Sequence, residues 1–227
     1  MKSAVIIPAA GLSTRMGAVK QLMMLGDKPV LIRTLEAFEN HKEIDEIVVV
    51  TTRDPAALIE AYKFKKVKAI VEGGSHRQAS VWAGLLAVSA DVEWVLIHDG
   101  ARPLVTKQAI SDILASVRQG CCAISGVKSK DTIKIADSGN SVTDTPDRTR
   151  AWIVQTPQGF PYELIKEAHR KAMEADFIGT DDAMLIERLG IPVYMVEGDY
   201  RNIKLTTPED ILIAEALLHM KINNIMR

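Results

Sequence analysis

The sequence contains only two cysteines, Cys121 and Cys122, and they are neighbours in the chain. Adjacent cysteines suit neither an ordinary disulfide nor a zinc site, which needs spaced ligands. We therefore interpret them as small buried residues of a protein from a reducing compartment. The five histidines also indicate no site, because none has a partner at the spacing of a zinc site or a serine triad.

The sequence also lacks an excess of charge and any long hydrophobic run. It has 28 lysines and arginines against 29 aspartates and glutamates, so its charge indicates neither nucleic-acid nor acidic-membrane binding, and any anion site must be local. No stretch is long enough to span a membrane and no signal-peptide core is present, which predicts a cytoplasmic protein. A chain of 227 residues is short for two domains, so we expect one.

Two common phosphate-binding motifs are absent from residues 8–21, which follow the first apolar run of the chain. No Gly-Lys-Ser/Thr sequence of a Walker loop is found there, and Ser13 stands where a dinucleotide fingerprint has its second glycine. An ordinary strand-to-loop turn with solvent-exposed charges is therefore one interpretation of this stretch.

The same loop nevertheless has the composition of an anion site. Ala9, Ala10 and Gly11 have side chains so small that a phosphate or a base can approach the backbone amides. Arg15 and Lys20 add two positive charges, as the phosphates of a nucleotide require. The loop thus predicts a nucleotide phosphate site.

Short β-branched runs alternate with amphipathic segments in the first half of the chain, a pattern typical of successive βαβ units. The expected strands are residues 4–7, 47–51, 67–71 and 94–98, and the expected helices are residues 31–38, 55–62, 76–88 and 107–118. Because these strands are apolar throughout, we predict a Rossmann-like, doubly wound, mostly parallel α/β sheet. Its carboxyl edge, where ligands bind in such sheets, would bring together Pro8, Gly73 and Asp99.

Residues 128–150 interrupt this pattern with two polar and apolar alternating runs around the turn sequence Asp137-Ser-Gly-Asn. The pattern predicts a β-hairpin. A hairpin that is polar on both faces buries little in its own subunit, so we expect a projecting arm that pairs with a second copy. A mobile surface loop is the alternative.

The last third of the chain continues with strands and helices. We expect a strand at 152–156, a helix at 161–175, a helix to residue 189 capped by Thr180 or Asp181, strands at 193–196 and 202–205, and a final helix that begins after Thr207.

Two further segments carry candidate functional residues between a strand and a helix. In Glu72-Gly-Gly-Ser-His-Arg-Gln-Ala-Ser, the amide of Gly73 or Gly74 and the hydroxyl of Ser80 could pair with a nucleobase. An ordinary glycine-rich connection is the alternative. In His98-Asp-Gly-Ala-Arg-Pro, Asp99 directly follows a buried strand and is a candidate ligand for a divalent cation.

Two basic residues could bind further anions. Arg102 lies three residues after Asp99 and could hold a second anion. Lys204 projects a compact charge that suits a phosphate, although a solvated lysine is the alternative. For Asp99 the alternative is a residue that only caps the next element.

Eight short motifs, spread in order over nearly the whole chain, resemble those of the 2-C-methyl-D-erythritol 4-phosphate cytidylyltransferases. They are Ala9-Ala-Gly with Arg15-Met and Lys20-Gln, Glu72-Gly-Gly with Arg77-Gln-Ala-Ser-Val, His98-Asp-Gly-Ala-Arg-Pro, Asp131-Thr, Asp147-Arg, Gln155-Thr-Pro-Gln-Gly-Phe, Thr180-Asp-Asp-Ala, and Asp199 with Asn202-Ile-Lys and Thr207-Pro-Glu-Asp. Eight motifs in order are far more specific than any single one.

The resemblance implies one nucleotidyltransferase domain over residues 1–227, homodimeric through the arm at 128–150, that joins CTP to the methylerythritol phosphate of isoprenoid biosynthesis. Arg15 and Lys20 would stabilise charge on the CTP phosphates, and Asp99 would hold Mg²⁺. Cytosine would be bound near Ala9, Ala10, Gly11, Gly73 and Ser80. Arg148 and Lys204 would place the second substrate, with Arg102, Thr132, Thr156 and Thr180 nearby; Thr132 and Arg148 would reach the partner's site.

The first motif departs from the family pattern. Ser13 replaces a glycine, Val19 replaces a proline, and the gap between Arg15 and Lys20 is shorter, which is similar to molybdenum-cofactor nucleotidyltransferases. A ribitol 5-phosphate cytidylyltransferase shares the expected architecture and is the nearest alternative enzyme. A nucleotide-binding regulatory subunit without turnover is the alternative from another class.

Overall fold

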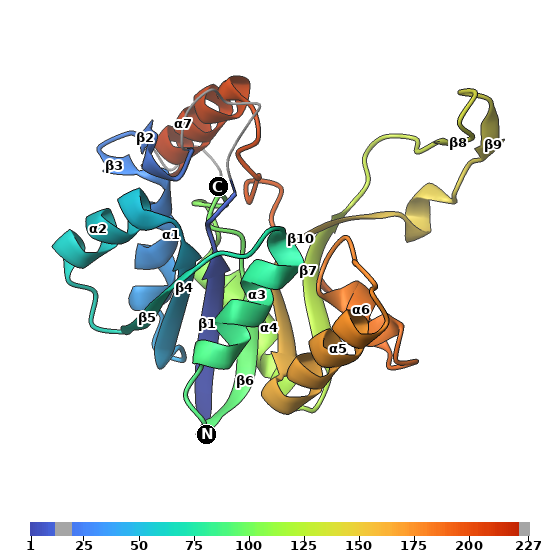
Figure 1. Cartoon of the computed structure of the whole chain (residues 1–227). Helices are drawn as coiled ribbons and strands as arrows, with labels where there is room; N and C mark the ends of the chain where they lie inside the picture. The colour runs from blue at the N-terminus through green and yellow to red at the C-terminus, as the bar shows by residue number, and fades with distance from the viewer. Residues whose placement is uncertain (12–19, 223–227) are drawn as a thin grey trace.

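A seven-stranded sheet with the order β11-β7-β10-β6-β1-β4-β5 forms the middle of the structure (Figure 1). The computed structural model describes the backbone of residues 1–11 and 20–222 and the side chains of residues 1–11 and 21–220. The strands are β1 (Lys2–Pro8), β4 (Glu46–Thr51), β5 (Val67–Glu72), β6 (Val92–Ile97), β7 (Cys122–Lys128), β10 (Trp152–Pro161) and β11 (Val193–Glu197). Only β10 runs antiparallel to its neighbours in this sheet, so the predicted mostly parallel α/β fold is confirmed.

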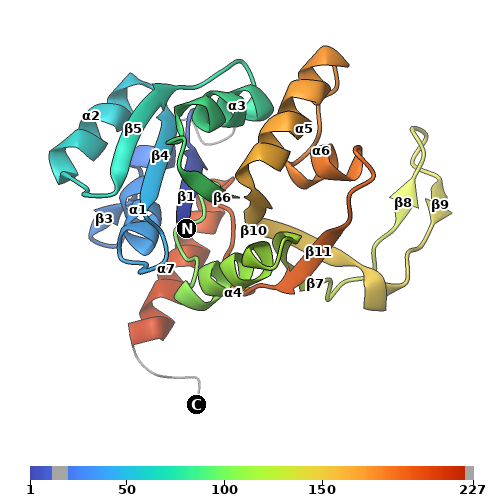
Figure 2. The same ribbon diagram turned by 90° about the horizontal axis from the view of Figure 1, so that it is seen from below.

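Helices cover both faces of the sheet (Figure 2). One face packs against α3 (Arg77–Ala87), α5 (Tyr162–Glu174) and α6 (Ala183–Glu187), and the other against α1 (Val30–Glu39), α2 (Arg53–Tyr62) and α4 (Lys107–Arg118). In β1, Ala4 and Ile6 belong to the first core, and Val5 and Ile7 to the second. Continuous apolar strands are required here because both faces are buried.

A smaller layer lies at the carboxyl edge of the sheet. It consists of the hairpin β2 (Met24–Leu25) and β3 (Lys28–Pro29), the short helix η1 (Lys20–Leu22) and the last helix α7 (Pro208–Ile222). Leu25, Leu205 and Ala214 form its core. Leu205 anchors the segment that carries Lys204 in this layer.

Two strand assignments from the sequence were incomplete or wrong. Residues 202–205 form no strand; the N–H of Leu205 instead donates to the carbonyl of Ala101, 2.9 Å away. This segment therefore binds the loop after β6 and not a sheet edge. Conversely β7 was not predicted, although Cys122 within it is 1% exposed and both cysteines are free thiols. Its small residues give no clear alternation. The predicted burial is confirmed for Cys122 and wrong for Cys121, which precedes the strand and is only half-buried.

The helix and strand ends differ by a few residues elsewhere. β10 continues to Pro161, and α6 ends at Glu187 and not at residue 189. The predicted helices at 31–38, 55–62, 76–88 and 107–118 correspond to α1 to α4. The Thr106 hydroxyl caps α4 by accepting from the N–H of Ala109 at 3.1 Å, the interaction that favours threonine before a helix.

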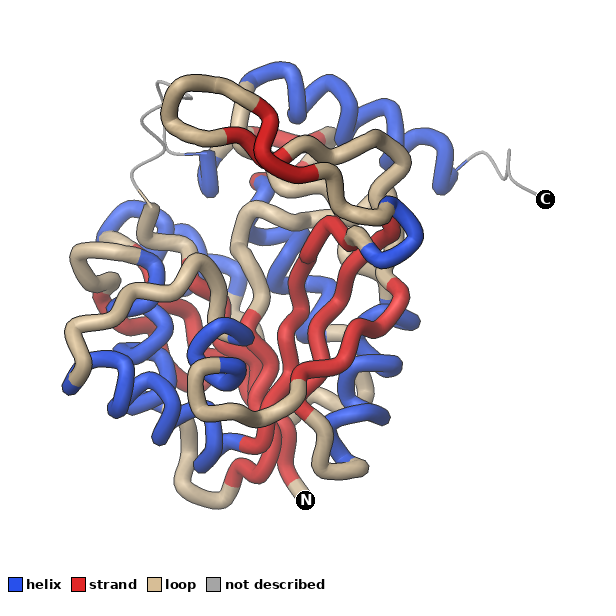
Figure 3. Tube along the Cα trace, turned by 90° about the vertical axis from the view of Figure 1, so that its right-hand side faces the viewer, coloured by secondary structure: helices blue, strands red, loops and turns tan. Residues whose placement is uncertain are grey.

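The predicted hairpin is present at the end of a projecting segment (Figures 1 and 3). β8 (Ile135–Ala136) pairs with β9 (Val142–Asp144) in the antiparallel sense. The Asp137 carboxylate accepts from the N–H groups of Gly139 and Ser141, both at 2.9 Å. The short helix η2 (Arg148–Arg150) leads back to β10. The hairpin lies at the same end of the molecule as α7, opposite the N-terminus.

Candidate active site

A cavity of about 470 Å³ lies at the carboxyl ends of β1, β5 and β6. Pro8, Gly73 and Asp99, predicted to meet at this edge, all line it, because parallel strands that neighbour one another end side by side. The other predicted residues on its wall are Ala9, Ala10, Gly11, Ser80 and Lys204. The structure thus unites seven of the predicted nucleotide, metal and phosphate residues with Pro8 in one cavity.

The glycine turn of this wall is packed closely against the first loop. A Cβ on Gly73 would lie 2.1 Å from the Cβ of Ala10, so no larger residue fits. The N–H of Gly73 donates to the carbonyl of Thr51 at 3.3 Å, and the N–H of Gly74 donates to the Ser80 hydroxyl at 3.1 Å. The expectation that these amides are free to pair with a base is therefore wrong, because both close the turn.

Gln21 was missed by the sequence analysis and holds the first loop together. Its side chain is buried, and its Nε2 donates to the carbonyls of Ala9 at 2.6 Å and Gly11 at 3.2 Å. The start of the loop is thereby tied to its end. This role depends on how close Gln21 lies to Ala9 and Gly11 in the folded chain, which the amino-acid composition does not reveal. Arg15 and the side chain of Lys20 lie outside the described residues.

Asp99 is the electrostatic centre of the cavity. Its Oδ2 lies 2.9 Å from Lys204 Nζ and 3.5 Å from Arg102 Nε, and its Oδ1 lies 3.3 Å from Arg77 Nε. Burial alone would raise the pKa of this carboxyl, but Arg77, Lys204 and Arg102 outweigh burial and hold the pKa well below its usual range. Asp99 is therefore ionised at any physiological pH, as a metal ligand must be.

A chain of hydrogen bonds fixes the backbone behind Asp99. Its N–H donates to the Thr156 hydroxyl at 3.0 Å, and that hydroxyl lies 3.1 Å from His98 Nδ1. His98 Nε2 lies 3.1 Å from the carbonyl of Arg102. Because a carbonyl only accepts, Nε2 carries the proton and Nδ1 accepts from Thr156. Burial lowers the pKa of His98 to about 4, so the ring is neutral.

Arg102 and Thr156, predicted to bind substrate, form the layer beneath Asp99. The Arg102 side chain is 11% exposed, and its Nη1 donates to the carbonyl of Asn202 at 2.7 Å. Burial lowers the pKa of Arg102. Thr156 is 4% exposed. In this chain both residues support Asp99 and the segment that carries Lys204.

Three other predicted substrate residues lie away from the described wall of the cavity. Thr132 and Arg148 are exposed on the arm, where Arg148 Nη1 donates to the carbonyl of Lys130 at 3.4 Å. Thr180 is exposed in the loop before α6, with its hydroxyl 3.8 Å from Met184 Sδ. The N-cap residue of α6 is Asp182 and neither predicted cap, although the Asp181 carboxylate accepts from the N–H of Met184 at 3.0 Å.

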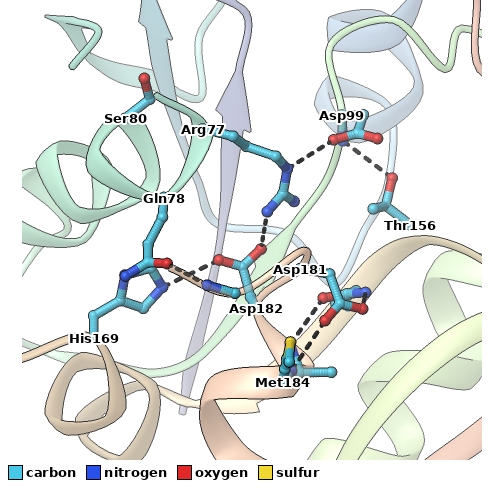
Figure 4. Close-up of polar contacts among 12 residues, drawn as sticks. Arg77, Gln78, Ser80, Asp99, Thr156, His169, Asp181, Asp182 and Met184 are labelled. Atoms are coloured by element: carbon cyan, nitrogen blue, oxygen red, sulfur yellow. Dashed lines mark hydrogen bonds and ion pairs between the residues drawn. The ribbon is translucent and has the colours of Figure 1, made fainter. Parts of the chain in front are cut away.

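Arg77 is a cavity residue that the sequence analysis quoted only within a motif. It begins α3, lines the cavity, and contacts Asp99 and the buried Asp182 (Figure 4). Burial would lower its pKa, but the two carboxylates raise it further above its usual range. A cation after a glycine turn was the available signal. Its pairing with Asp182, 105 positions later, depends on tertiary packing.

No helix within the described part of the chain has the length and apolar character needed to cross a bilayer.

The comparisons with known proteins agree with one another. A family model described as 2-C-methyl-D-erythritol 4-phosphate cytidylyltransferase matches residues 3–220. A protein of that name from Caldanaerobacter subterraneus subsp. tengcongensis is 47% identical, over 96% of this chain and 99% of the relative. One from Geobacter metallireducens is 45% identical, over 96% of this chain and 97% of the relative.

Solved structures show the same relationship. The structure of 4-diphosphocytidyl-2C-methyl-D-erythritol synthase from Anaerococcus prevotii is similar with a TM-score of 0.87 and 36% identity, over 96% of each chain. The Thermus thermophilus 2-C-methyl-D-erythritol 4-phosphate cytidylyltransferase is similar with a TM-score of 0.80 and 33% identity, over 96% of this chain and all of that one, 100%. On sequence and structure together, the chain belongs to the 2-C-methyl-D-erythritol 4-phosphate cytidylyltransferase family.

Proposed function

We propose that the protein is a nucleotidyltransferase that joins CTP to 2-C-methyl-D-erythritol 4-phosphate, giving 4-diphosphocytidyl-2-C-methyl-D-erythritol and pyrophosphate in isoprenoid biosynthesis. The observation that carries the proposal is the family match over residues 3–220, together with one cavity that contains the small-residue turns, Asp99 and Lys204. Small residues leave room for a nucleotide against the backbone, and the charged residues provide contacts for phosphates.

The reaction requires two polyanions to be brought together. An oxygen of the methylerythritol phosphate attacks the α-phosphorus of CTP, and the bond to the departing pyrophosphate breaks with its electron pair on the pyrophosphate oxygen. No covalent intermediate with the enzyme is needed. Cations that hold both substrates in line therefore supply most of the rate acceleration.

In this proposal each predicted residue has a role. Ala9, Ala10, Gly11, Gly73 and Ser80 form the wall against which the cytidine lies. Arg15 and Lys20 stabilise the charge that develops on the CTP phosphates. Lys204 and Arg148 bind the phosphate of the second substrate, with Thr132 and Thr180 next to it and Arg102 and Thr156 holding Asp99 from below.

Mg²⁺ or another divalent cation is the expected cofactor. Residues 1–11 and 20–222 contain no group of three or more His, Cys, Asp or Glu side chains that could hold a metal by themselves. Asp99 nevertheless fits, because it is an ionised carboxylate on the cavity wall, and Mg²⁺ at phosphates typically uses one or two carboxylates together with waters. Asp99 would hold the ion, which would neutralise phosphate charge when bound.

A homodimer is part of the proposal. The arm exposes the apolar side chains of Ile133, Ile135 and Val142, and an isolated hairpin of this size is marginal on its own. A second copy that receives the arm would cover these side chains. Thr132 and Arg148 of the arm would then lie at the cavity of that second copy. The cytoplasm is the expected location, because a reducing compartment keeps the thiols of Cys121 and Cys122 free.

The test is the release of pyrophosphate from CTP and Mg²⁺, measured separately with methylerythritol phosphate and with ribitol 5-phosphate. We expect release with methylerythritol phosphate and a cytidine diphosphate ester as the second product, identified by ³¹P NMR. Release with ribitol phosphate in its place would indicate the related cytidylyltransferase. Binding of CTP without release in either mixture would indicate a regulatory subunit.

A further inference from the structure

Arg77 joins two carboxylates that come from different parts of the chain (Figure 4). Its Nε lies 3.3 Å from Asp99 Oδ1, at the end of β6, and its Nη1 lies 2.7 Å from Asp182 Oδ2, which precedes α6. Asp99 belongs to the cavity wall, whereas Asp182 is 1% exposed. The planar guanidinium can hold both carboxylates because its donors point in fixed, diverging directions.

Asp182 is itself held from several sides. Its Oδ1 lies 3.1 Å from Nε2 of His169, which is 0% exposed on α5. The preceding loop is tied to α3 by Gln78, whose Oε1 accepts from the N–H of Gly179 at 2.9 Å. The loop is also tied to β10 by Gln158, whose Nε2 donates to Asp181 Oδ2 at 2.8 Å. Asp182 is therefore fixed in place, so a movement of the Arg77 side chain would break the ion pair between them.

The two oxygens of Asp99 have different partners. Oδ2 faces Lys204 and Arg102, whereas Oδ1 faces Arg77. Lys204 is the cation that the proposed reaction uses for a substrate phosphate, which will compete with Asp99 for it. Arg77 keeps its contact with Asp182 in the same event, because a buried carboxylate is costly to leave without a partner. Asp99 then retains a fixed partner on Oδ1.

We propose that Arg77 is a positioning residue for cytidylyl transfer: the buried pair of Asp182 and His169 holds it in place, and it fixes the orientation of the Asp99 carboxylate in the cavity. This inference rests on the proposed function. It assigns a role in the reaction to Asp182 and His169, two buried residues on the far side of Arg77 from Asp99.

The experiment compares steady-state kinetics of the full chain, with CTP, Mg²⁺ and methylerythritol phosphate, for Asp182→Asn, Arg77→Lys and the double variant. Asparagine keeps the shape of Asp182 without its charge, and lysine keeps the charge of Arg77 without its fork. We expect kcat to fall about tenfold or more in each variant, with KM for methylerythritol phosphate within about threefold, as loss of an interaction in the transition state requires. The double variant should be no slower than the slower single variant, because the two residues act as one unit.

Two matched controls separate this role from general stability. Asp91→Asn removes the charge of an exposed aspartate that pairs with Lys2 on the surface. Arg118→Lys alters an arginine that pairs with Glu43 on the surface. Both should keep the wild-type kcat. Thermal unfolding of every variant is measured alongside, since a purely structural role lowers Tm but leaves kcat unchanged well below Tm.

The outcomes are distinguishable. Wild-type kcat in Asp182→Asn and Arg77→Lys, or losses that simply add in the double variant, would overturn the inference. If Asp182→Asn is unfolded at the assay temperature, Arg77→Lys decides alone, because it keeps a positive charge beside Asp182, and a normal kcat there overturns the inference. Failure of the proposed function is seen earlier, as a wild-type protein that releases no pyrophosphate.

Discussion

The cavity and the arm are stabilised in opposite ways. Around the cavity, charges that are distant in sequence pair with one another, as Lys204 does with Asp99 and Arg77 with Asp182. On the arm the hydrogen bonds join residues close in sequence, such as those from Gly139 and Ser141 to Asp137, and nearly every side chain of residues 130–150 is exposed. The cavity is thus fixed by the fold of one chain, whereas the arm, apart from the contact of Lys130 with the Tyr200 ring at its base, is held by its own residues.

This difference bears on the proposed role of a second copy. Residues on the cavity wall have their positions set by the cores on both sides of the sheet. Thr132 and Arg148 have no such support within the described part of the chain, although both are proposed to contact a substrate. The predictions below test whether the cavity works by electrostatics that one chain provides, and whether the arm completes it in the partner.

The largest effect is expected from the cations of the first loop. Arg15→Ala or Lys20→Ala should lower kcat roughly a hundredfold or more, the usual result of removing one charge contact in the transition state. The measurement is pyrophosphate release at saturating substrates. Lys66→Ala is the control, because Lys66 Nζ donates to the carbonyl of His41, outside the cavity. Near-normal turnover in both loop variants would contradict their roles.

A mixing experiment tests whether the arm acts in the partner. Lys204→Ala removes a cavity cation and Arg148→Ala removes an arm cation, and each alone should lower activity at least tenfold. If arms cross, a heterodimer of the two variants has one site with both residues intact. Random pairing then restores about a quarter of the wild-type activity, since half of the dimers are mixed and each has one good site.

The comparison of mixed and separate samples gives the answer. The two variants are unfolded and refolded together, and activity is measured against each variant refolded alone. No gain on mixing would mean that Arg148 serves its own chain or none, and the proposed crossing of arms would be wrong. Wild-type protein taken through the same procedure is the control for recovery.

A glycine in each region provides a smaller, steric test. Gly73→Ala would place a Cβ 2.1 Å from the Cβ of Ala10 and 3.2 Å from Ser80 Oγ, so the turn must move, at a cost of about 1–3 kcal/mol in the free energy of unfolding. Gly139→Ala on the arm meets only Asp137 Oδ1, at 3.3 Å, and should stay within about 0.5 kcal/mol of wild type. Urea unfolding measures both. Equal effects would show that the glycine turn is no tighter than the arm.

The same contrast explains what the sequence could predict. Pro8, Gly73 and Asp99 were correctly brought together because strand order and direction follow from the βαβ pattern. The contact of Arg77 with Asp182 was not predictable, because it depends on how α3 packs beside the loop before α6. Residues 202–205 were wrongly predicted as a strand, since an extended segment that binds a loop has the same local pattern as one in a sheet.

The smallest effect concerns the stability of the cavity floor against pH. Burial lowers the pKa of His98 to about 4 in the folded protein, whereas an unfolded histidine has a pKa of about 6.5. The unfolded state therefore binds more protons between these values, so the stabilising effect of neutral His98 is complete above pH 6.5 and is lost as the pH falls toward 4. Between pH 7.5 and 5.5 the free energy of unfolding should fall by about 1 kcal/mol on this account.

Urea unfolding of wild type and His98→Gln over this pH range isolates the contribution of His98. The quantity compared is the change in the free energy of unfolding with pH, and not its absolute value. Burial also lowers the pKa of His41, so the wild-type slope includes a second histidine of the same sign. His41→Gln serves as the matched control and should remove only that part. An unchanged slope in His98→Gln would mean that His98 is not the neutral ring whose Nδ1 accepts from Thr156, and the hydrogen-bond chain behind Asp99 would have to run in another direction.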